Sequence, residues 1–206
     1  MHSAKPAVSL QVGILCLAAF SLWTTSAGAQ APAAVPVFQI TPGESKIQFD
    51  VKASVAIEGT FDQWEASLTF TSTAAESAVL DVKIQAASVN TGSGLKDGTL
   101  KGKDFFNVEQ DPLITFHSTQ IVQTGPETFD VQGTFTIRGV SKPETLQLTV
   151  SGKGTGAGVI TGTMAFDRKD YGMTSGIPFI KIADRVEVRV NLKGKRVSGP
   201  PVVFKQ

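Results

Sequence analysis

The strongest constraint on the fold is an alternation of apolar and polar residues that returns along most of the chain. The clearest example is 186–192, where aliphatic residues alternate with charged and amide residues. Successive side chains of a β-strand point to opposite faces of a sheet, so a period of two indicates strands with one buried face. The same alternation occurs in four other segments: 47–51, 80–84, 129–137 and 146–150.

Further strands are expected between these segments, which gives about eight or nine strands in total. The additional segments are Val55–Phe61, Glu65–Thr71, Ile114–Gln123 and Val159–Arg168. They are separated by short turns such as Thr124–Pro126 and Gly152–Gly158. Parallel strands need long crossover segments and are usually apolar on both faces, whereas these strands are not. The pattern therefore predicts an all-β antiparallel barrel or sandwich.

One segment, Thr91–Asn107, interrupts the strand pattern. It is rich in glycine and lysine, and its apolar residues are spaced as in a short, irregular helix. Its glycines weaken a helix. We expect Phe105 and Phe106 to hold this helical excursion against the sheet; the alternative is a loop that plugs one end.

The amino-terminal segment has the order of a secretory signal peptide. Lys5 precedes an apolar run over Val8–Trp23, and Ala27-Gly28-Ala29 provides a cleavage site of the Ala-x-Ala type. The run is interrupted by polar residues and lacks the roughly 20 consecutive apolar residues of a membrane span. We predict a signal peptide over 1–29, a flexible Ala/Pro-rich leader over 30–36, and one domain over 37–206.

Charge and cysteine content narrow the function. Lys5 is the one charged residue that cleavage removes, so the remaining basic and acidic residues balance. This balance argues against nucleic acid as a partner, because such domains usually carry a basic excess. The single cysteine, Cys16, leaves with the signal peptide, so the mature domain has no disulfide or thiolate ligand. An exported, cysteine-free domain favours a periplasmic location.

A catalytic or metal-binding set is not evident, and we expect no enzyme and no cofactor. His117 is the one histidine after processing, and the strand pattern turns it toward solvent. Carboxylate pairs such as Asp104 with Glu109, or Asp167 with Asp170, lie near turns, where such residues are usually solvated. The glycines of 152–158 match no phosphate-binding spacing and indicate a hairpin turn.

Phenylalanine is the abundant aromatic residue, with 13 in the chain against one tyrosine. Five of them fall at inward positions of different strands: Phe49, Phe70, Phe116, Phe135 and Phe166. A small barrel either fills its interior with side chains or holds a ligand there. The phenylalanines therefore form either an ordinary aromatic core or an apolar cavity for a long apolar molecule.

Several motifs resemble the YceI-like family of periplasmic lipid-binding proteins. The central motifs are Ala87-Ser88-Val89-Asn90-Thr91-Gly92, Asp104-Phe105-Phe106-Asn107-Val108-Glu109 and Asp111-Pro112-Leu113-Ile114-Thr115-Phe116. Flanking motifs are Gly59-Thr60-Phe61, Gly133-Thr134-Phe135-Thr136-Ile137-Arg138-Gly139 and Asp167-Arg168-Lys169-Asp170-Tyr171-Gly172-Met173. Thr99 stands where the family often has a histidine, and Trp64 where it commonly has a phenylalanine.

The resemblance implies an extended eight-stranded antiparallel barrel, lipocalin-like, with a short helical excursion and an apolar tunnel. It also implies a carrier that sequesters a polyisoprenoid, an isoprenoid quinone or another long-chain lipid. Alternation and motifs together give the expected lining residues: Phe49, Phe70, Ile84, Phe105, Phe116, Phe135 and Phe166. Asp97 and Asp104 are expected to be structural caps. The alternative function is an envelope stress chaperone or interaction module that binds no lipid. Whether the protein forms a homodimer also stays open.

Overall fold

The computed structural model describes residues 34–54, 57–177 and 179–206. The chain divides into two compact units, 1–32 and 33–206, and the first lies outside the described residues. The predicted signal peptide, residues 30–33 of the predicted leader and the first two residues of the predicted strand Val55–Phe61 therefore lie outside them too. Within the described part, no helix has the length and apolarity needed to cross a membrane.

The second unit is built almost entirely of strands, with one short α-helix. The strands are β1 (Val37–Ile40), β2 (Lys46–Ala53), β3 (Ile57–Phe61), β4 (Trp64–Phe70), β5 (Ala78–Gln85), β6 (Val89–Asn90), β7 (Leu113–Gln123), β8 (Thr128–Ile137), β9 (Val140–Ser151), β10 (Ala157–Asp167) and β11 (Ile182–Ser198). The helix is α1 (Gly94–Lys101), and four 3-10 turns are η1 (Pro42–Glu44), η2 (Ala75–Ser77), η3 (Ala86–Ser88) and η4 (Arg168–Tyr171). The prediction of an all-β domain with a short helical excursion is confirmed.

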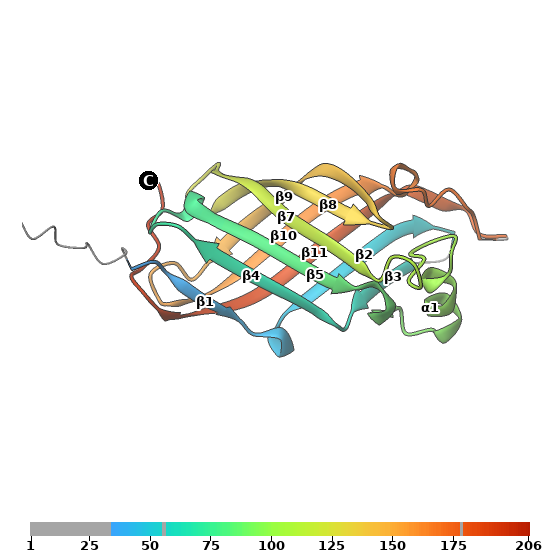
Figure 1. The fold of residues 1–206 in the computed structure, drawn as a ribbon, viewed down its shortest axis with the longest axis horizontal. Coiled ribbons are helices and arrows are strands. Elements are labelled where there is room, and N and C mark those ends of the chain that lie inside the picture. The colour runs from blue at the N-terminus through green and yellow to red at the C-terminus, as the bar shows by residue number, and fades with distance from the viewer. Residues whose placement is uncertain (1–33, 55–56, 178) are drawn as a thin grey trace, which may run out of the picture. The chain divides into compact units, whose positions relative to one another are not determined.

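All strands belong to one curled antiparallel sheet, which Figure 1 shows around a common interior. The hydrogen-bonded order is β4-β5-β7-β8-β9-β10-β11-β2-β3-β6, and β1 pairs with β11 off this path. The prediction of eight strands in a closed barrel is wrong. The described sheet has eleven strands, and β4 at one end of the order pairs only with β5, so no ladder closes it.

The length of β11 explains part of this difference. Its first part pairs with β2 from Ile182 to Asn191, and its last part pairs with β1 from Gly194 to Ser198. One continuous strand thus has two successive partners on the same edge. The alternation in the sequence shows that 186–192 is a strand, but it does not show how many partners the strand takes.

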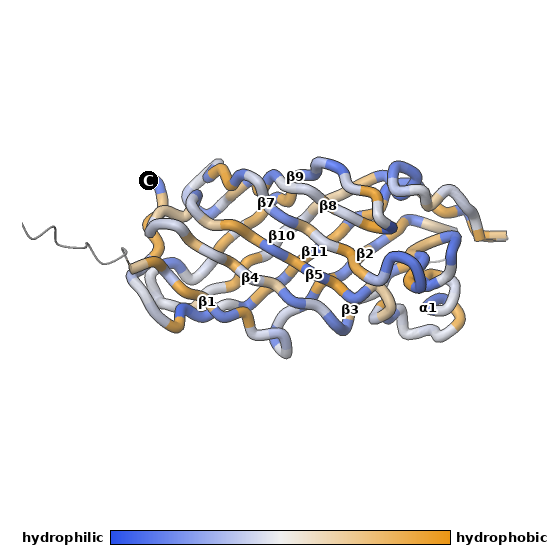
Figure 2. Tube along the Cα trace, in the orientation of Figure 1, coloured by the Kyte–Doolittle hydropathy of each residue, from blue (hydrophilic) through white to orange (hydrophobic). Residues whose placement is uncertain are grey.

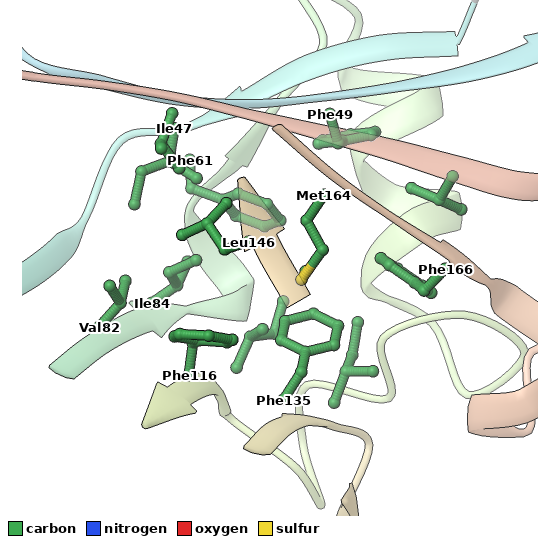
Figure 3. Packing of buried hydrophobic residues seen from close by; sticks show 14 of the residues in the cluster. Ile47, Phe49, Phe61, Val82, Ile84, Phe116, Phe135, Leu146, Met164 and Phe166 are labelled. Carbon is green, nitrogen blue, oxygen red and sulfur yellow. The ribbon is translucent and has the colours of Figure 1, made fainter. Parts of the chain in front are cut away.

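The interior is formed by the apolar side of the alternation, as the sequence predicts. Figure 2 shows apolar and polar residues alternating along the strands. In β2 the buried residues are Ile47, Phe49 and Val51, and the residues between them are exposed or half-buried. Figure 3 shows buried side chains from strands far apart in the sheet order, among them Phe49 of β2 and Phe116 of β7, in one apolar cluster.

The two ends of the interior are closed by different segments. Helix α1 lies at one end of the sheet, and the carboxyl terminus lies at the opposite end (Figure 1). Leu100, Phe105 and Phe106 are buried, so the excursion is held to the sheet by its apolar residues as expected. Pro36, which the sequence assigns to the leader, is buried directly before β1, and the preceding Val35 packs on the core.

Candidate ligand-binding cavities

An apolar cavity of about 70 Å³, named cavity 2, lies at the α1 end of the interior. Five of the seven predicted lining residues meet there: Phe49, Ile84, Phe105, Phe135 and Phe166. They come from β2, β5, the segment after α1, β8 and β10. The curvature of the sheet thus brings together residues that are separated by more than a hundred positions in the chain.

Two groups of packed aromatic rings contribute to the walls of cavity 2. Phe49, Phe61 and Phe106 form the first group, with ring centroids 5.5 to 6.2 Å apart. Phe135 and Phe166 belong to the second, and they pack against Tyr171, which does not line the cavity, with centroids 5.1 to 5.5 Å apart. Tilted and edge-to-face rings at these distances attract each other beyond the area they bury. The aromatic walls are therefore held in fixed positions.

The one charged residue that lines cavity 2 is Arg168, and its donors are occupied. Its guanidinium donates hydrogen bonds to the carbonyl oxygens of Ala183, Met173 and Ser175, the last at 2.8 Å. It also donates to Asp184 Oδ1 at 3.1 Å. A guanidinium with these partners has little capacity left for a ligand head group. Arg168 instead fixes the segment between η4 and β11 across this end.

Two pairs of titratable groups support the same end. Lys169 lies 2.8 Å from Asp184 and, together with Arg168, holds the pKa of that carboxyl below its usual value. The hydroxyl of Tyr171 donates to Glu144 Oε1 at 2.9 Å. Burial of the ring, followed by the nearby Glu144 carboxylate, raises the pKa of Tyr171 because both disfavour the phenolate. Tyr171 thus serves as a neutral hydrogen-bond donor.

A second apolar cavity, named cavity 1, has a volume of about 100 Å³ and lies at the opposite end. Phe70 is the one predicted lining residue found there. Its walls come from β1, β4, β5, β7, β8, β9, β10 and β11, together with Ala75 of η2. Val202 and Phe204 of the carboxyl-terminal segment complete it.

A layer of buried side chains separates the two cavities along β5, β7 and β10. In β5, Ala78 lines cavity 1 and Ile84 lines cavity 2, while Leu80 between them lines neither. The predicted lining residue Phe116 belongs to this layer: it is buried but lines neither cavity. Its ring lies over Gly133, where an added Cβ would come within 2.6 Å of Phe116 Cζ. A continuous tunnel requires this layer to move.

The two aspartates expected to be caps differ in their surroundings. Asp97 Oδ1 accepts hydrogen bonds from Thr91 N at 2.8 Å and from Thr91 Oγ1 at 2.7 Å. These bonds hold the pKa of Asp97 below its ordinary value and tie the first turn of α1 to the preceding loop. The described contacts include no such bond for Asp104.

The described part of the chain presents no group of His, Cys, Asp and Glu residues able to hold a metal ion. His117 projects from the outer face of β7, with its side chain 60% exposed. Its Nδ1 lies 2.6 Å from Asp81 Oδ1 on the neighbouring strand. This surface pair faces away from both cavities.

Sequence reasoning missed part of each cavity. Cavity 2 includes Phe61, Met173 and Ile177, and cavity 1 includes Val202 and Phe204. Phe61 could have been found, since it follows the Gly59-Thr60 pair at an inward strand position. The carboxyl-terminal residues gave only a weak signal, three consecutive apolar residues at 202–204 without a partner strand in the sequence.

The curled antiparallel sheet and its apolar interior cavities place this chain among all-β proteins with an apolar interior. The chain matches the YceI-like domain over residues 38–194. It therefore belongs to the YceI-like family.

Relatives and solved structures agree with this assignment. A UPF0312 protein of Pseudomonas savastanoi pv. phaseolicola is 32% identical over 134 residues, which cover 62% of this chain and 69% of the relative. The structure of Burkholderia cenocepacia BcnA is similar with a TM-score of 0.68 and 25% identity, over 75% of this chain and 99% of BcnA. A polyisoprenoid-binding domain from Saccharophagus degradans has the same fold at 17% identity, with a TM-score of 0.61, over 78% of this chain and 99% of that domain.

Proposed function

We propose that this protein is a periplasmic binding protein that sequesters a polyisoprenoid or a similar long-chain amphiphile in its apolar interior. The observation that carries the proposal is cavity 2, where all lining residues except Arg168 are apolar and the guanidinium of Arg168 is already bound. Such a site selects a ligand by shape and apolar surface. It offers no cluster of polar groups for acid-base or nucleophilic chemistry, which supports binding over catalysis.

The ligand class follows from the free energy of transfer. Each methylene moved from water into an apolar site gains about 0.8 kcal/mol. An isoprenoid chain has many such groups, so it can bind tightly without a specific hydrogen bond, less the cost of ordering the chain. The polyisoprenoid-binding name of the Saccharophagus degradans domain supports the same ligand class. A long chain would have to displace the layer around Phe116, or extend out of cavity 2 past 173–182.

The first test is native mass spectrometry of the protein purified from its own cells, followed by organic extraction. We expect a long-chain lipid in about one-to-one ratio with the protein. A ligand-free mass, together with no uptake of added polyisoprenoid, would contradict the proposal. Sequencing the amino terminus of the same sample tests the periplasmic assignment, which predicts a chain that begins after Ala29.

A matched pair of variants tests the position of the ligand. Val188 lines cavity 2 opposite Phe49 in the β2–β11 ladder, and Val197 on the same strand is 53% exposed. Val188→Phe should fill the cavity and reduce bound lipid at least tenfold, whereas Val197→Phe should leave it unchanged. Overpacking costs about 1–3 kcal/mol, so folding is checked by circular dichroism. Equal lipid content in the two variants would place the ligand elsewhere.

A second candidate function is an interaction module of the envelope that binds unfolded proteins. Two exposed apolar residues favour this function: Phe179, which is 106% exposed, and Leu95, which is 84% exposed. A holdase assay separates the candidates. If the lipid-free protein suppresses aggregation of an unfolded client and Phe179→Ser with Leu95→Ser abolishes this, the interaction function is supported.

A further inference from the structure

The carboxyl-terminal tail, residues 200–206, covers the end of cavity 1. Its side chains alternate: Val202 and Phe204 are half-buried and line the cavity, while Val203 and Lys205 are exposed. The ring of Phe204 lies 6.1 Å from that of Phe129, and the Lys153 ammonium lies 4.9 Å from its centroid. The tail therefore places an apolar side chain where a ligand's apolar chain would lie.

Few bonds hold the tail, and none belongs to the long ladders of the sheet. Val203 forms an isolated parallel bridge with Ala74: its N–H donates to Thr73 O at 2.7 Å, and Ala75 N donates to its carbonyl at 2.9 Å. Two hydrogen bonds join the backbone of Lys205 to the Gln123 side chain, at 2.7 and 2.8 Å. The ammonium of Lys205 pairs with Glu76.

The connection between β11 and the tail takes no part in the ladders, so detachment of the tail leaves the sheet intact. Gly199 has a φ of +77°, and Pro200 and Pro201 follow it without a ladder partner. Segments with few buried contacts open locally at much lower free energy than the core. The family match ends at residue 194, before the tail begins.

We propose that cavity 1 is a binding site for a linear apolar chain, separate from cavity 2, and that the tail is its gate. Ligand enters when residues 200–206 detach, and it takes the position of Phe204. The proposal shares with the proposed function only the class of ligand. Its separateness rests on the buried layer that contains Leu80, Phe116 and Met164, none of which lines either cavity.

A reversible disulfide tests the gate. Ala74 and Val203 are exposed bridge partners, and neighbouring strands lie about 4.8 Å apart, within the roughly 4.4–6.8 Å that a disulfide spans between Cα atoms. The variant carries Ala74→Cys, Val203→Cys and Cys16→Ser, which removes the chain's single native cysteine. Uptake of the apolar fluorophore N-phenyl-1-naphthylamine is followed by stopped flow.

We expect the oxidised protein to take up the fluorophore at least tenfold more slowly than the same protein after reduction. The Cys16→Ser protein without the pair controls for the reductant. Deletion of 200–206 should give the fastest uptake, and Phe204→Ala serves the same purpose if the deletion does not fold. Equal rates with and without the disulfide would overturn the gate.

Variants that fill one cavity or the other show which cavity takes up the fluorophore. Ala78 lines cavity 1, so Ala78→Leu should remove the disulfide-sensitive uptake, with Ile160→Phe as a second filler if Ala78→Leu does not fold. Val188→Phe in cavity 2 should leave it unchanged. The opposite result would show entry into cavity 2 and overturn the separate site. Because the fluorophore is added, this result is independent of whether cells load the protein with lipid.

Discussion

The two ends of the interior are closed in different ways. At the α1 end, rings pack on rings around cavity 2, and Arg168 donates four hydrogen bonds, two to the segment before β11 and two to the start of β11. At the other end, one half-buried ring, an exposed ion pair and a few hydrogen bonds hold the tail over cavity 1. The comparison teaches that one apolar interior can have a rigid end and an end that opens.

The largest expected effect is at the rigid end. Phe135→Ala removes a ring that contacts both Phe166 and Tyr171, and truncation of a buried phenylalanine costs about 3–5 kcal/mol. Urea unfolding followed by circular dichroism measures this loss. Phe179→Ala is the control, because that side chain is fully exposed and its removal should change the free energy of unfolding by less than about 0.5 kcal/mol. Equal losses would contradict the packing described at this end.

Removal of the Arg168 guanidinium should have the next largest effect. Arg168→Met leaves the carbonyl oxygens of Met173 and Ser175 without this donor, and we expect a loss of about 2–3 kcal/mol. Hydrogen exchange should accelerate at 173–184 more than elsewhere. The control is Arg189→Met, because the Arg189 side chain is 54% exposed on β11. Unchanged exchange at 173–184 would show that the guanidinium does not hold this segment.

The tail should contribute less to stability than either feature. Phe204→Ala removes a half-buried ring outside the sheet, and we expect a loss of about 1 kcal/mol or less in urea unfolding. Hydrogen exchange in 200–206 should rise at the same time, while exchange in β8 stays slow. A loss as large as that of Phe135→Ala would mean that the tail is part of the core and that both ends are equally rigid.

The smallest expected effect is a pH dependence of tail attachment. The hydrogen bond from Lys205, followed by that from Gln123 N, lowers the pKa of Glu76 below its ordinary value. A carboxyl with a depressed folded-state pKa stabilises the attached state above its unfolded pKa and loses this contribution as the pH falls through the folded value. Limited proteolysis of the tail should therefore be faster at pH 3 than at pH 7. The protease used must be active at both pH values, and its activity on an unfolded substrate is matched between them.

Glu76→Gln is the control for this titration. The variant should show at pH 7 the tail sensitivity that the parent shows only at low pH, and it should lose most of the difference between the two conditions. If the variant and the parent respond equally to pH, other carboxyl groups account for the effect.

The sequence alone determined the fold class and much of cavity 2. Alternation assigns each residue of β2 or β8 to one face, because successive side chains of a strand point to opposite sides. This local rule placed Phe49, Phe135 and Phe166 inside, and the apolar residues after α1 placed Phe105 there.

Only the tertiary structure decided how the sheet curls, that its described part has eleven strands without a closing ladder, and where empty space remains. Pairing partners and packing gaps depend on contacts between residues far apart in the chain, which alternation does not specify. Phe116 is the clearest case: its inward position was predictable, but its place over Gly133, outside both cavities, depends on the neighbouring strand. Phe204 is placed over cavity 1 in the same way, because its neighbours Lys205 and Val203 bond to Gln123 and Thr73, which lie far away in the chain.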